Sequence, residues 1–308
     1  MRGILRPANE WNVTNTGNSQ IMDMSLFFGI AAALCWGSSD FVAKLAIAKI
    51  GYLRATLFMQ LVGISFMLLI TGTDVGLLLS FPKEAYLAVA LGAVNAIATV
   101  ALFKSFEVGQ LSIMSPIASS YPALASILAL LFLNEHVTRM RFLGIMCIFA
   151  GIVLVSFQRK STFRAEPKRI AAGAGYALTA FGFMGFLYFA LKLVVIDLGG
   201  FLPVLVIRLV TASIVGTVLL FSGSRSVSGP TSVLYLVAFV GIVDSLANVA
   251  YNIGISVGTV TVVSFVSSLF SAVTILLACA LLKERLLRHQ IIGIMSIMSG
   301  IAVIGCFP

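Results

Sequence analysis

Charged side chains are scarce in this sequence, and acidic ones most of all. Charged residues make up 10% of the 308 positions, with 11 acidic against 20 basic side chains, whereas 60% of the residues are hydrophobic. A soluble domain carries about a quarter charged residues, so this chain has too few polar groups to cover a water-facing surface. With a mean hydropathy of +1.09, the composition predicts a protein that lies in a lipid bilayer.

Histidine and cysteine are also rare, which weakens the hypothesis of an intramembrane enzyme. Such an enzyme needs His, Cys or carboxylate side chains gathered at one depth as ligands, nucleophile or base. The two histidines, His136 and His289, fall at the ends of apolar segments, and the four cysteines show neither metal-site spacing nor a secreted disulfide framework. We therefore expect no catalytic residue, no metal site and no cofactor.

Long polar stretches are missing as well, so we expect no soluble module for ATP hydrolysis or signalling. A spanning helix needs roughly 17–25 apolar residues, and the chain contains about ten such segments. They lie near residues 25–48, 53–71, 84–105, 110–133, 139–157, 171–195, 201–221, 231–252, 259–282 and 288–306. A membrane receptor or scaffold is an alternative reading, but it would have almost no surface outside the bilayer for a partner.

The basic residues gather between the apolar segments. A polar tail at 1–24 precedes the first segment, and residues 158–170 form a basic linker in the middle of the chain. Basic loops beside spanning segments set the orientation of a membrane protein. We therefore assign the net charge of +9 to this role and expect no binding to nucleic acid.

The second half of the sequence repeats the first. The stretch that starts at Ser115 aligns without a gap with the one that starts at Ser264, and the shift 284 − 135 = 149 places Glu135 on Glu284. A shift of 148 aligns the earlier parts of the two halves. Because repeats identify the architecture before any single residue does, this is the strongest signal in the chain.

The repeat divides the chain into two units, residues 25–157 and 171–308, of about five spans each. With an odd number of spans per unit, the second unit enters the membrane upside down relative to the first. Inverted repeats are a common plan of secondary transporters, with the substrate site near the midplane between the units. The sequence thus predicts an all-α polytopic membrane protein of about ten transmembrane helices, built as two inverted five-helix repeats.

Several motifs follow one another in a fixed order along the units, and some of them occur in both. The first span carries a tryptophan-glycine pair, a second span has an early arginine, the fourth spans end at a glutamate, and the fifth spans have spaced glycines: Trp36-Gly37, Arg208, Glu135 and Glu284, Gly144 to Gly151 and Gly293 to Gly300. This order resembles the drug/metabolite transporter superfamily in its ten-helix EamA form, over about residues 25–306. The sequence departs from that pattern at Gln60, where an arginine is expected, and at Met184, where a tryptophan is expected.

The resemblance implies a function. It implies a secondary transporter, not an enzyme, that moves a small metabolite or drug-like solute without ATP by alternating access through a cavity between the units. It also implies a multi-pass protein of the cell membrane whose partners are the lipid bilayer and the solute, with or without a coupled proton or other ion. Both a monomer and a homodimer fit this class.

Polar residues in the first span of each unit are the first cavity candidates. Trp36, Asp40 and Lys44 are spaced four apart, so they form one stripe along a helix in which the two charges can pair beside the indole. Tyr188 and Lys192 occupy the matching positions, 148 residues on. The alternative is that Lys44 extends to the membrane surface while Asp40 pairs locally.

The third spans supply a second group. Asn95 and Thr99 share one helix face, as do Asp244 and Asn248 at the matching positions, with Tyr251 about one turn further. A charge at the bilayer centre costs about 2.5–3.5 kcal/mol, so Asp244 needs a partner or water. Arg208 is the best candidate, either as a structural ion pair or as a fork for a carboxylate or phosphate of the solute.

The fourth spans supply hydroxyl groups. Ser119 and Tyr121 lie in the first unit, and Ser264, Ser267 and Ser268 lie in the second. Serines at this spacing are typical of packing between helices, with a hydroxyl-lined substrate wall as the alternative. The sequence leaves both interpretations open.

The inverted repeat generates a first testable prediction about orientation. Loop 158–169 is expected on the membrane face opposite both termini, because an odd number of spans separates it from each. A cysteine placed at residue 162 and one placed at the C-terminus should therefore react with an impermeant thiol reagent from opposite sides. Reaction of both from the same side would rule out the inverted arrangement.

Overall fold

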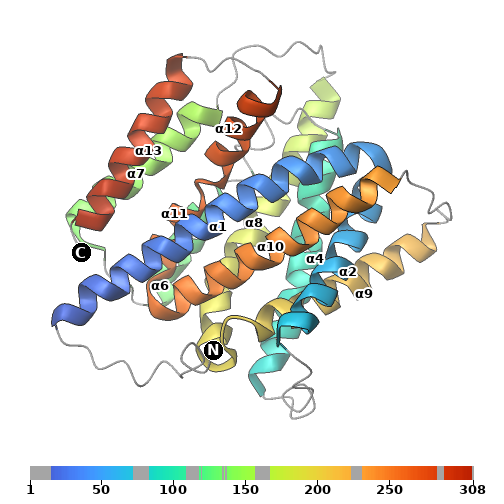
Figure 1. Cartoon of the computed structure of the whole chain (residues 1–308), viewed down its shortest axis with the longest axis horizontal. Coiled ribbons are helices and arrows are strands. Elements are labelled where there is room, and N and C mark those ends of the chain that lie inside the picture. Colours follow the sequence, from blue (N-terminus) through green and yellow to red (C-terminus); the bar gives the residue numbers. More distant parts are fainter. Residues whose placement is uncertain are drawn as a thin grey trace.

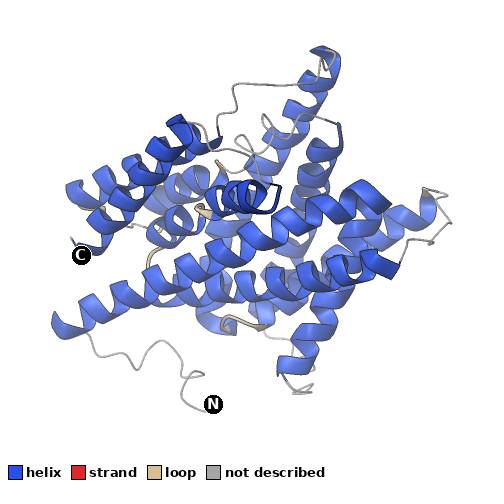
Figure 2. Ribbon diagram, turned by 45° about the horizontal axis from the view of Figure 1, so that its top comes forward, coloured by secondary structure: helices blue, strands red, loops and turns tan. Residues whose placement is uncertain are grey.

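The computed structural model describes residues 15–71, 83–108, 118, 120–133, 135, 137–156, 167–222, 231–282 and 288–306. Across these ranges the regular structure is α-helical and contains no strand (Figure 2). Ser119, Glu284, His136 and most of the predicted tail and linker lie outside the described residues.

The helices follow the predicted segments (Figure 1). The first unit contains α1 (Asn15–Ile50), α2 (Tyr52–Thr71), α4 (Lys83–Val108), α6 (Tyr121–Phe132) and α7 (Arg139–Ser156). The second contains α8 (Pro167–Leu198), α9 (Leu202–Phe221), α10 (Thr231–Val257), α11 (Val260–Ser267), α12 (Phe270–Leu282) and α13 (Arg288–Cys306). Each predicted segment holds a helix, and the ninth holds two because it is interrupted between α11 and α12.

Two helices begin earlier than the hydrophobic pattern predicts. α1 begins at Asn15, inside the predicted polar tail, and α8 begins at Pro167, inside the predicted linker. Helical hydrogen bonds do not require apolar side chains, and a proline is well suited to the first turn because its missing N–H has no helical partner there. These helix starts are therefore more polar than the spans that follow them.

The outer surface of the bundle is apolar. Six helices, namely α1, α2, α4, α8, α9 and α10, are long and apolar enough to cross a membrane, and shorter apolar runs lie in α7, α11–α12 and α13. Leu69, Leu220 and Phe221 are more than four-fifths exposed, at 82%, 84% and 88%. Such a surface is stable against lipid and not against water. The prediction of an all-helical polytopic membrane protein is confirmed.

The two units pack against each other reciprocally. α1 lies along α10, and its equivalent α8 lies along α4 (Figure 1). α1 also contacts α11 and α12, as α8 contacts α6, while α2 pairs with α9 and α7 pairs with α13. The first helix of each unit therefore packs on the third and fourth helices of the other, which is the contact pattern of two units related by a twofold axis.

Glycines allow the closest of these approaches. A Cβ added at Gly37 of α1 would lie 2.5 Å from Cβ of Val273 in α12, and one added at Gly185 of α8 would lie 2.8 Å from Cβ of Leu124 in α6. The two contacts are equivalent in the repeat, because Gly185 corresponds to Gly37 (185 − 37 = 148) and Val273 corresponds to Leu124 (273 − 124 = 149). The same close contact between helices therefore occurs in both units.

Glycines also form the turns between the first two helices of each unit. Gly51 follows α1 with φ +79°, and Gly199 follows α8 with φ +70°. This left-handed conformation suits glycine because it has no Cβ. A single residue, Gly51, separates α1 from α2.

The fifth helices form a separate pair. A Cβ on Gly300 of α13 would lie 2.6 Å from the carbonyl oxygen of Gly144 in α7, so the two backbones are close. The Ser296 hydroxyl donates to the carbonyl oxygen of Cys147 at 2.8 Å. Ser296 and Cys147 are equivalent residues, since 296 − 147 = 149, so this contact lies on the axis between the units.

The glycine joint generates a stability prediction. Gly37→Ala should lower the free energy of unfolding in detergent by about 1–3 kcal/mol, because the added methyl group overpacks α1 against α12. The melting temperature should fall accordingly. Gly182→Ala in α8 is the matched control, since a Cβ there meets nothing within 4 Å. That variant should be neutral or slightly stabilised, because alanine favours a helix over glycine. Equal melting temperatures for the two variants would contradict the close approach at Gly37.

Candidate functional site

A cavity of about 140 Å³ lies between the two units. It is lined by α1, α2, α4 and α6 of the first unit and by α8, α9, α10 and α12 of the second, whereas the described residues of α7 and α13 do not reach it. A volume of this size has room for a cluster of water molecules or a small solute. The lining therefore depends on both repeats.

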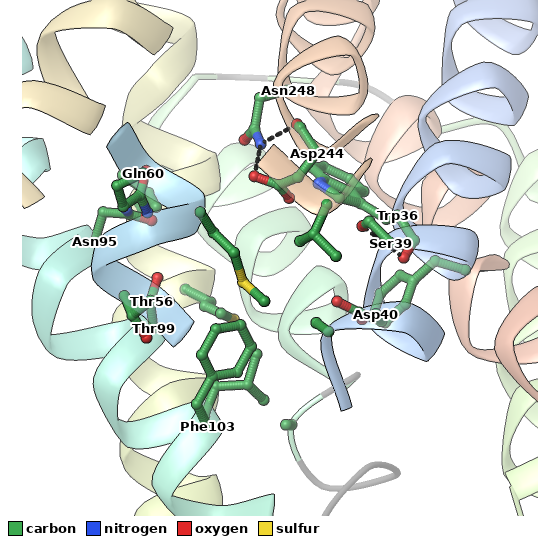
Figure 3. Close-up of a pocket in the computed structure, with 18 of the residues that line it drawn as sticks. Trp36, Ser39, Asp40, Thr56, Gln60, Asn95, Thr99, Phe103, Asp244 and Asn248 are labelled. Atoms are coloured by element: carbon green, nitrogen blue, oxygen red, sulfur yellow. Dashed lines mark hydrogen bonds between the residues drawn. The ribbon is translucent and has the colours of Figure 1, made fainter. Parts of the chain in front are cut away.

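Polar side chains from the second and third helices of the units line this cavity (Figure 3). They include Gln60 from α2, Asn95 and Thr99 from α4, and Asp244 and Asn248 from α10. All of these but Gln60 are among the predicted site residues. The polar faces that helical spacing predicted in the third spans, α4 and α10, therefore line the same cavity.

Arg208 of α9 is at the centre of the polar network. Its Nη2 donates to Oδ2 of Asp244 at 2.5 Å, and its Nη1 donates to Oε1 of Gln60 at 2.7 Å. Nδ2 of Asn248 donates to the same Asp244 oxygen at 3.2 Å. The ion pair expected between Arg208 and Asp244 is therefore present, with Arg208 buried at 4% exposure and Asp244 partly exposed at 31%.

The contact between Arg208 and Gln60 has a geometric meaning. These residues are equivalent in the repeat, since 208 − 60 = 148, and equivalent residues that touch lie on the axis relating the units. In an inverted repeat that axis runs in the plane of the membrane. The guanidinium is therefore held near the middle of the bilayer, where its charge needs the partners that it has.

A second set of hydrogen bonds fixes α9 from the other side. Nδ2 of Asn95 donates to Oγ1 of Thr211 at 3.0 Å, and the Thr211 hydroxyl donates to the carbonyl oxygen of Gly92 at 3.2 Å. Asn95 and Asp244 are equivalent positions, yet both bind α9. The polar network is therefore asymmetric, in agreement with the departures of the two units from a common pattern.

Four aromatic rings form another part of the cavity wall. Trp36 of α1 meets Tyr188 of α8 edge to face at 5.4 Å between ring centroids, and Tyr188 stacks on Tyr121 of α6 at 4.8 Å. Phe270 of α12 contacts Tyr121 at 6.2 Å and Trp36 at 6.3 Å, which closes the circuit. All four line the cavity. We refer to Trp36, Tyr121, Tyr188 and Phe270 as the aromatic wall.

Asp40 and Lys44 both line the cavity from α1, as their spacing predicts. The ion pair expected between them stays a prediction. Asp40 is partly buried, close to Trp36 and Ser39 (Figure 3), whereas Lys44 is exposed further along α1. A spacing of four residues brings two side chains onto one face of a helix, but the rotamers decide whether they meet.

Several other predicted residues do not reach the cavity. Tyr251 is fully buried behind the aromatic wall, and its hydroxyl shares a 2.7 Å hydrogen bond with Ser264. The hydroxyls of Ser267 and Ser268 donate back to carbonyl oxygens three residues earlier in the chain. In the described residues these serines therefore serve the packing and the break between α11 and α12. Lys192 also lies elsewhere, bound to the end of α10.

Sequence reasoning missed part of the lining. Gln60 was identified as the counterpart of Arg208, but only the fold shows that the two side chains touch. Thr56 and Thr274 line the cavity as single polar residues in apolar spans, and Met59 and Phe103 resemble lipid-facing residues in type. For these four, the sequence carries no signal that separates an inward from an outward position.

Comparisons with known proteins identify the class. Residues 23–157 and 171–306 each match the EamA-like transporter family. The chain belongs to this family, and it is a membrane transporter of the drug/metabolite transporter type. It is therefore a polytopic membrane protein that handles a small-molecule solute.

The chain is also similar to individual proteins. An uncharacterised protein of Methanocaldococcus jannaschii is 29% identical over 135 residues, which cover 44% of this chain and 98% of that protein. A solved crystal structure superimposes with a TM-score of 0.74 at 18% identity, over 91% of this chain and 95% of the other. At that identity the likeness shows the fold alone.

The Arg208 network generates a prediction about stability. Asp244→Asn should lower the melting temperature and the yield of folded protein, because it leaves the buried guanidinium without its counter-ion at a cost of about 3–5 kcal/mol. Adding Arg208→Gln should recover part of this loss, since the unpaired charge is then gone. The control is Asp197→Asn, which removes an exposed carboxylate outside the cavity. A wild-type melting temperature for Asp244→Asn would show that the pair contributes nothing to stability.

Proposed function

We propose that this chain is a secondary transporter of the cell membrane that carries a small solute through the central cavity by alternating access, without ATP. The observation that carries the proposal is a difference between two equivalent lysines, since Lys44 lines the cavity whereas Lys192 lies outside it and binds the end of α10. In an inverted repeat, equivalent residues lie on opposite sides of the membrane. Their environments thus report which end of the cavity is closed.

Lys192 belongs to the closed end. Its Nζ donates to the carbonyl oxygens of Ile255 and Gly258, the second at 2.6 Å. These carbonyls lie at the C-terminal end of α10, where a positive charge is favoured by the helix dipole. The lysine thereby fastens α8 to the end of α10.

Glu135 holds the next element at the same end. Its carboxylate accepts hydrogen bonds from the backbone N–H of Val260 at 2.7 Å and of Thr261 at 3.1 Å, and from the Thr261 hydroxyl at 2.7 Å. A carboxylate in this position caps the N-terminus of α11. Glu135 of the first unit therefore binds main chain of the second unit. We refer to Lys192 and Glu135 with these partners as the closure.

The equivalent lysine of the first unit marks the other end of the cavity. Lys44, the equivalent of Lys192, is exposed and lines the cavity, which extends along α4 to Phe106. Glu284, the equivalent of Glu135, lies outside the described residues. If the two units exchange conformations, Lys44 takes the role of Lys192 and the accessible end changes sides. That exchange is the rocking of inverted repeats on which alternating access depends.

Cysteine accessibility tests this mechanism. In a chain whose native cysteines are replaced, Ser267→Cys reports on the closed side and Thr99→Cys on the open side, because Ser267 is fully buried and Thr99 lines the cavity. Glu135→Ala with Lys192→Met removes five charge-assisted hydrogen bonds, each worth about 1.5–3 kcal/mol. This exceeds the roughly 5.5 kcal/mol that reverses a 99:1 population. Reaction with a thiol reagent should become faster at position 267 and slower at position 99.

The reciprocal change is the decisive result. Loss of packing alone would speed the reaction at position 267 without slowing it at position 99, and that outcome would contradict alternating access. The matched control is Glu107→Ala with Lys104→Met, which removes an exposed pair of the same charges. It should leave both rates at their reference values.

A further inference from the structure

The cavity reaches the face of the bundle at which α1 ends and α2 begins, which we call the α1–α2 face. Lys44 and Phe106, in the last two turns of α1 and α4, line the cavity at this face, and Lys44 is exposed. Their equivalents at the opposite face are Lys192 and Ile255 (255 − 106 = 149). Neither belongs to the described lining, and Ile255 is fully buried. A solute therefore enters the described conformation from the α1–α2 face.

The direction of each helix assigns the other elements to one of the two faces (Figure 1). α4 and α9 end at the α1–α2 face, and α8, α10 and α13 begin there. The opposite face holds the starts of α1, α4 and α7, the ends of α8 and α13, and the closure. The open end of the cavity and the two ends of the described chain thus lie on different sides of the membrane.

Basic residues are concentrated at the α1–α2 face. Among the described helix ends, those at this face carry the lysines and arginines Lys44, Lys49, Arg54, Lys104, Lys168, Arg169 and Arg288. Those at the opposite face carry Lys83, Arg139, Arg141 and Lys192. The acidic residues have the reverse distribution, with Glu107 at the α1–α2 face and Asp23, Glu84, Glu135 and Asp197 at the other. The formal charges of the described helix ends are therefore 7 − 1 = +6 at the α1–α2 face and 4 − 4 = 0 at the opposite face.

The sequence between the described helices has the same bias. The basic residues that fall between helices that end and begin at the α1–α2 face are Arg159, Lys160, Arg164, Arg225, Lys283 and Arg285. At the opposite face, Arg2 and Arg6 precede α1. Lysine and arginine beside spanning segments stay on the cytoplasmic side, where anionic lipid headgroups attract them. The excess of positive charge therefore marks one face of this bundle as cytoplasmic.

We propose that the α1–α2 face is the cytoplasmic face, so that the described conformation opens the cavity to the cytoplasm. The start of α1 and the end of α13 then face the cell exterior. The closure formed by Lys192 and Glu135 separates the cavity from that exterior. The proposal rests on the proposed transport function, for which it names the side from which the solute is bound in this conformation.

Thiol labelling of intact cells tests the orientation. In a chain whose native cysteines are replaced, Thr162→Cys lies between α7 and α8, and Pro308→Cys follows α13. A membrane-impermeant maleimide added to intact cells should label Pro308→Cys and should label Thr162→Cys only after the cells are permeabilised. The chain without cysteines gives the background. Labelling of Thr162→Cys in intact cells, or of Pro308→Cys only after permeabilisation, would overturn the proposal.

Membrane vesicles of the two orientations test the side on which the cavity opens. Thr99→Cys, which lines the cavity, should react with the same maleimide about tenfold faster or more in inside-out vesicles than in right-side-out vesicles. The ratio follows because a minor conformation that opens to the other side is populated to at most about a tenth. Faster reaction in right-side-out vesicles would show that the cavity opens to the exterior and would overturn the proposal.

The outcome is independent of the test of alternating access. The reciprocal change at positions 267 and 99 is measured on purified protein in detergent, where the reagent reaches both faces of the bundle. If that change is found and the cells show the reverse labelling, the orientation is wrong and alternating access stands. If the labelling is as expected and the reciprocal change is missing, the orientation stands and the transport mechanism is wrong.

Discussion

One buried charge at the interface of the two units constrains the arrangement around the cavity. A guanidinium near the middle of a membrane needs a counter-charge and hydrogen-bond acceptors, and Arg208 finds them in both repeats, in Gln60 of the first and Asp244 of the second. The units cannot separate at this point without exposing the charge to lipid. The polar residues that line the cavity therefore also hold the two units together.

Much of this arrangement was predictable from the sequence, because it depends on periodicity and register. Continuous apolar runs located the helices, and the constant shift between the units indicated which helices are equivalent. The faces of Asn95 and Asp244 followed from helical spacing. The partnership of Arg208 with Asp244 followed from the cost of leaving either charge alone in lipid.

The remaining features depend on three-dimensional contacts that spacing does not encode. Asp40 and Lys44 satisfy the spacing of a helical ion pair, but spacing alone does not determine whether their charged groups meet. Lys192 and Glu135 bind main-chain groups, which every residue type has. A pattern of side chains in the sequence therefore cannot predict these contacts. Whether a serine lines a cavity or bonds its own helix is equally invisible, since both arrangements use the same residue at the same position.

The turn at Gly51 has a mechanical consequence for how the cavity can respond to its contents. A single residue between α1 and α2 leaves no slack in the chain, so a displacement of α1 along its axis is transmitted directly to α2. α1 carries Trp36 and Asp40, while α2 carries Gln60, which holds Arg208. A movement of Trp36 with α1 is therefore expected to move Gln60 with α2, because the two helices are joined by one residue. The contact between Gln60 and Arg208 on the axis between the units would then change with the contents of the cavity.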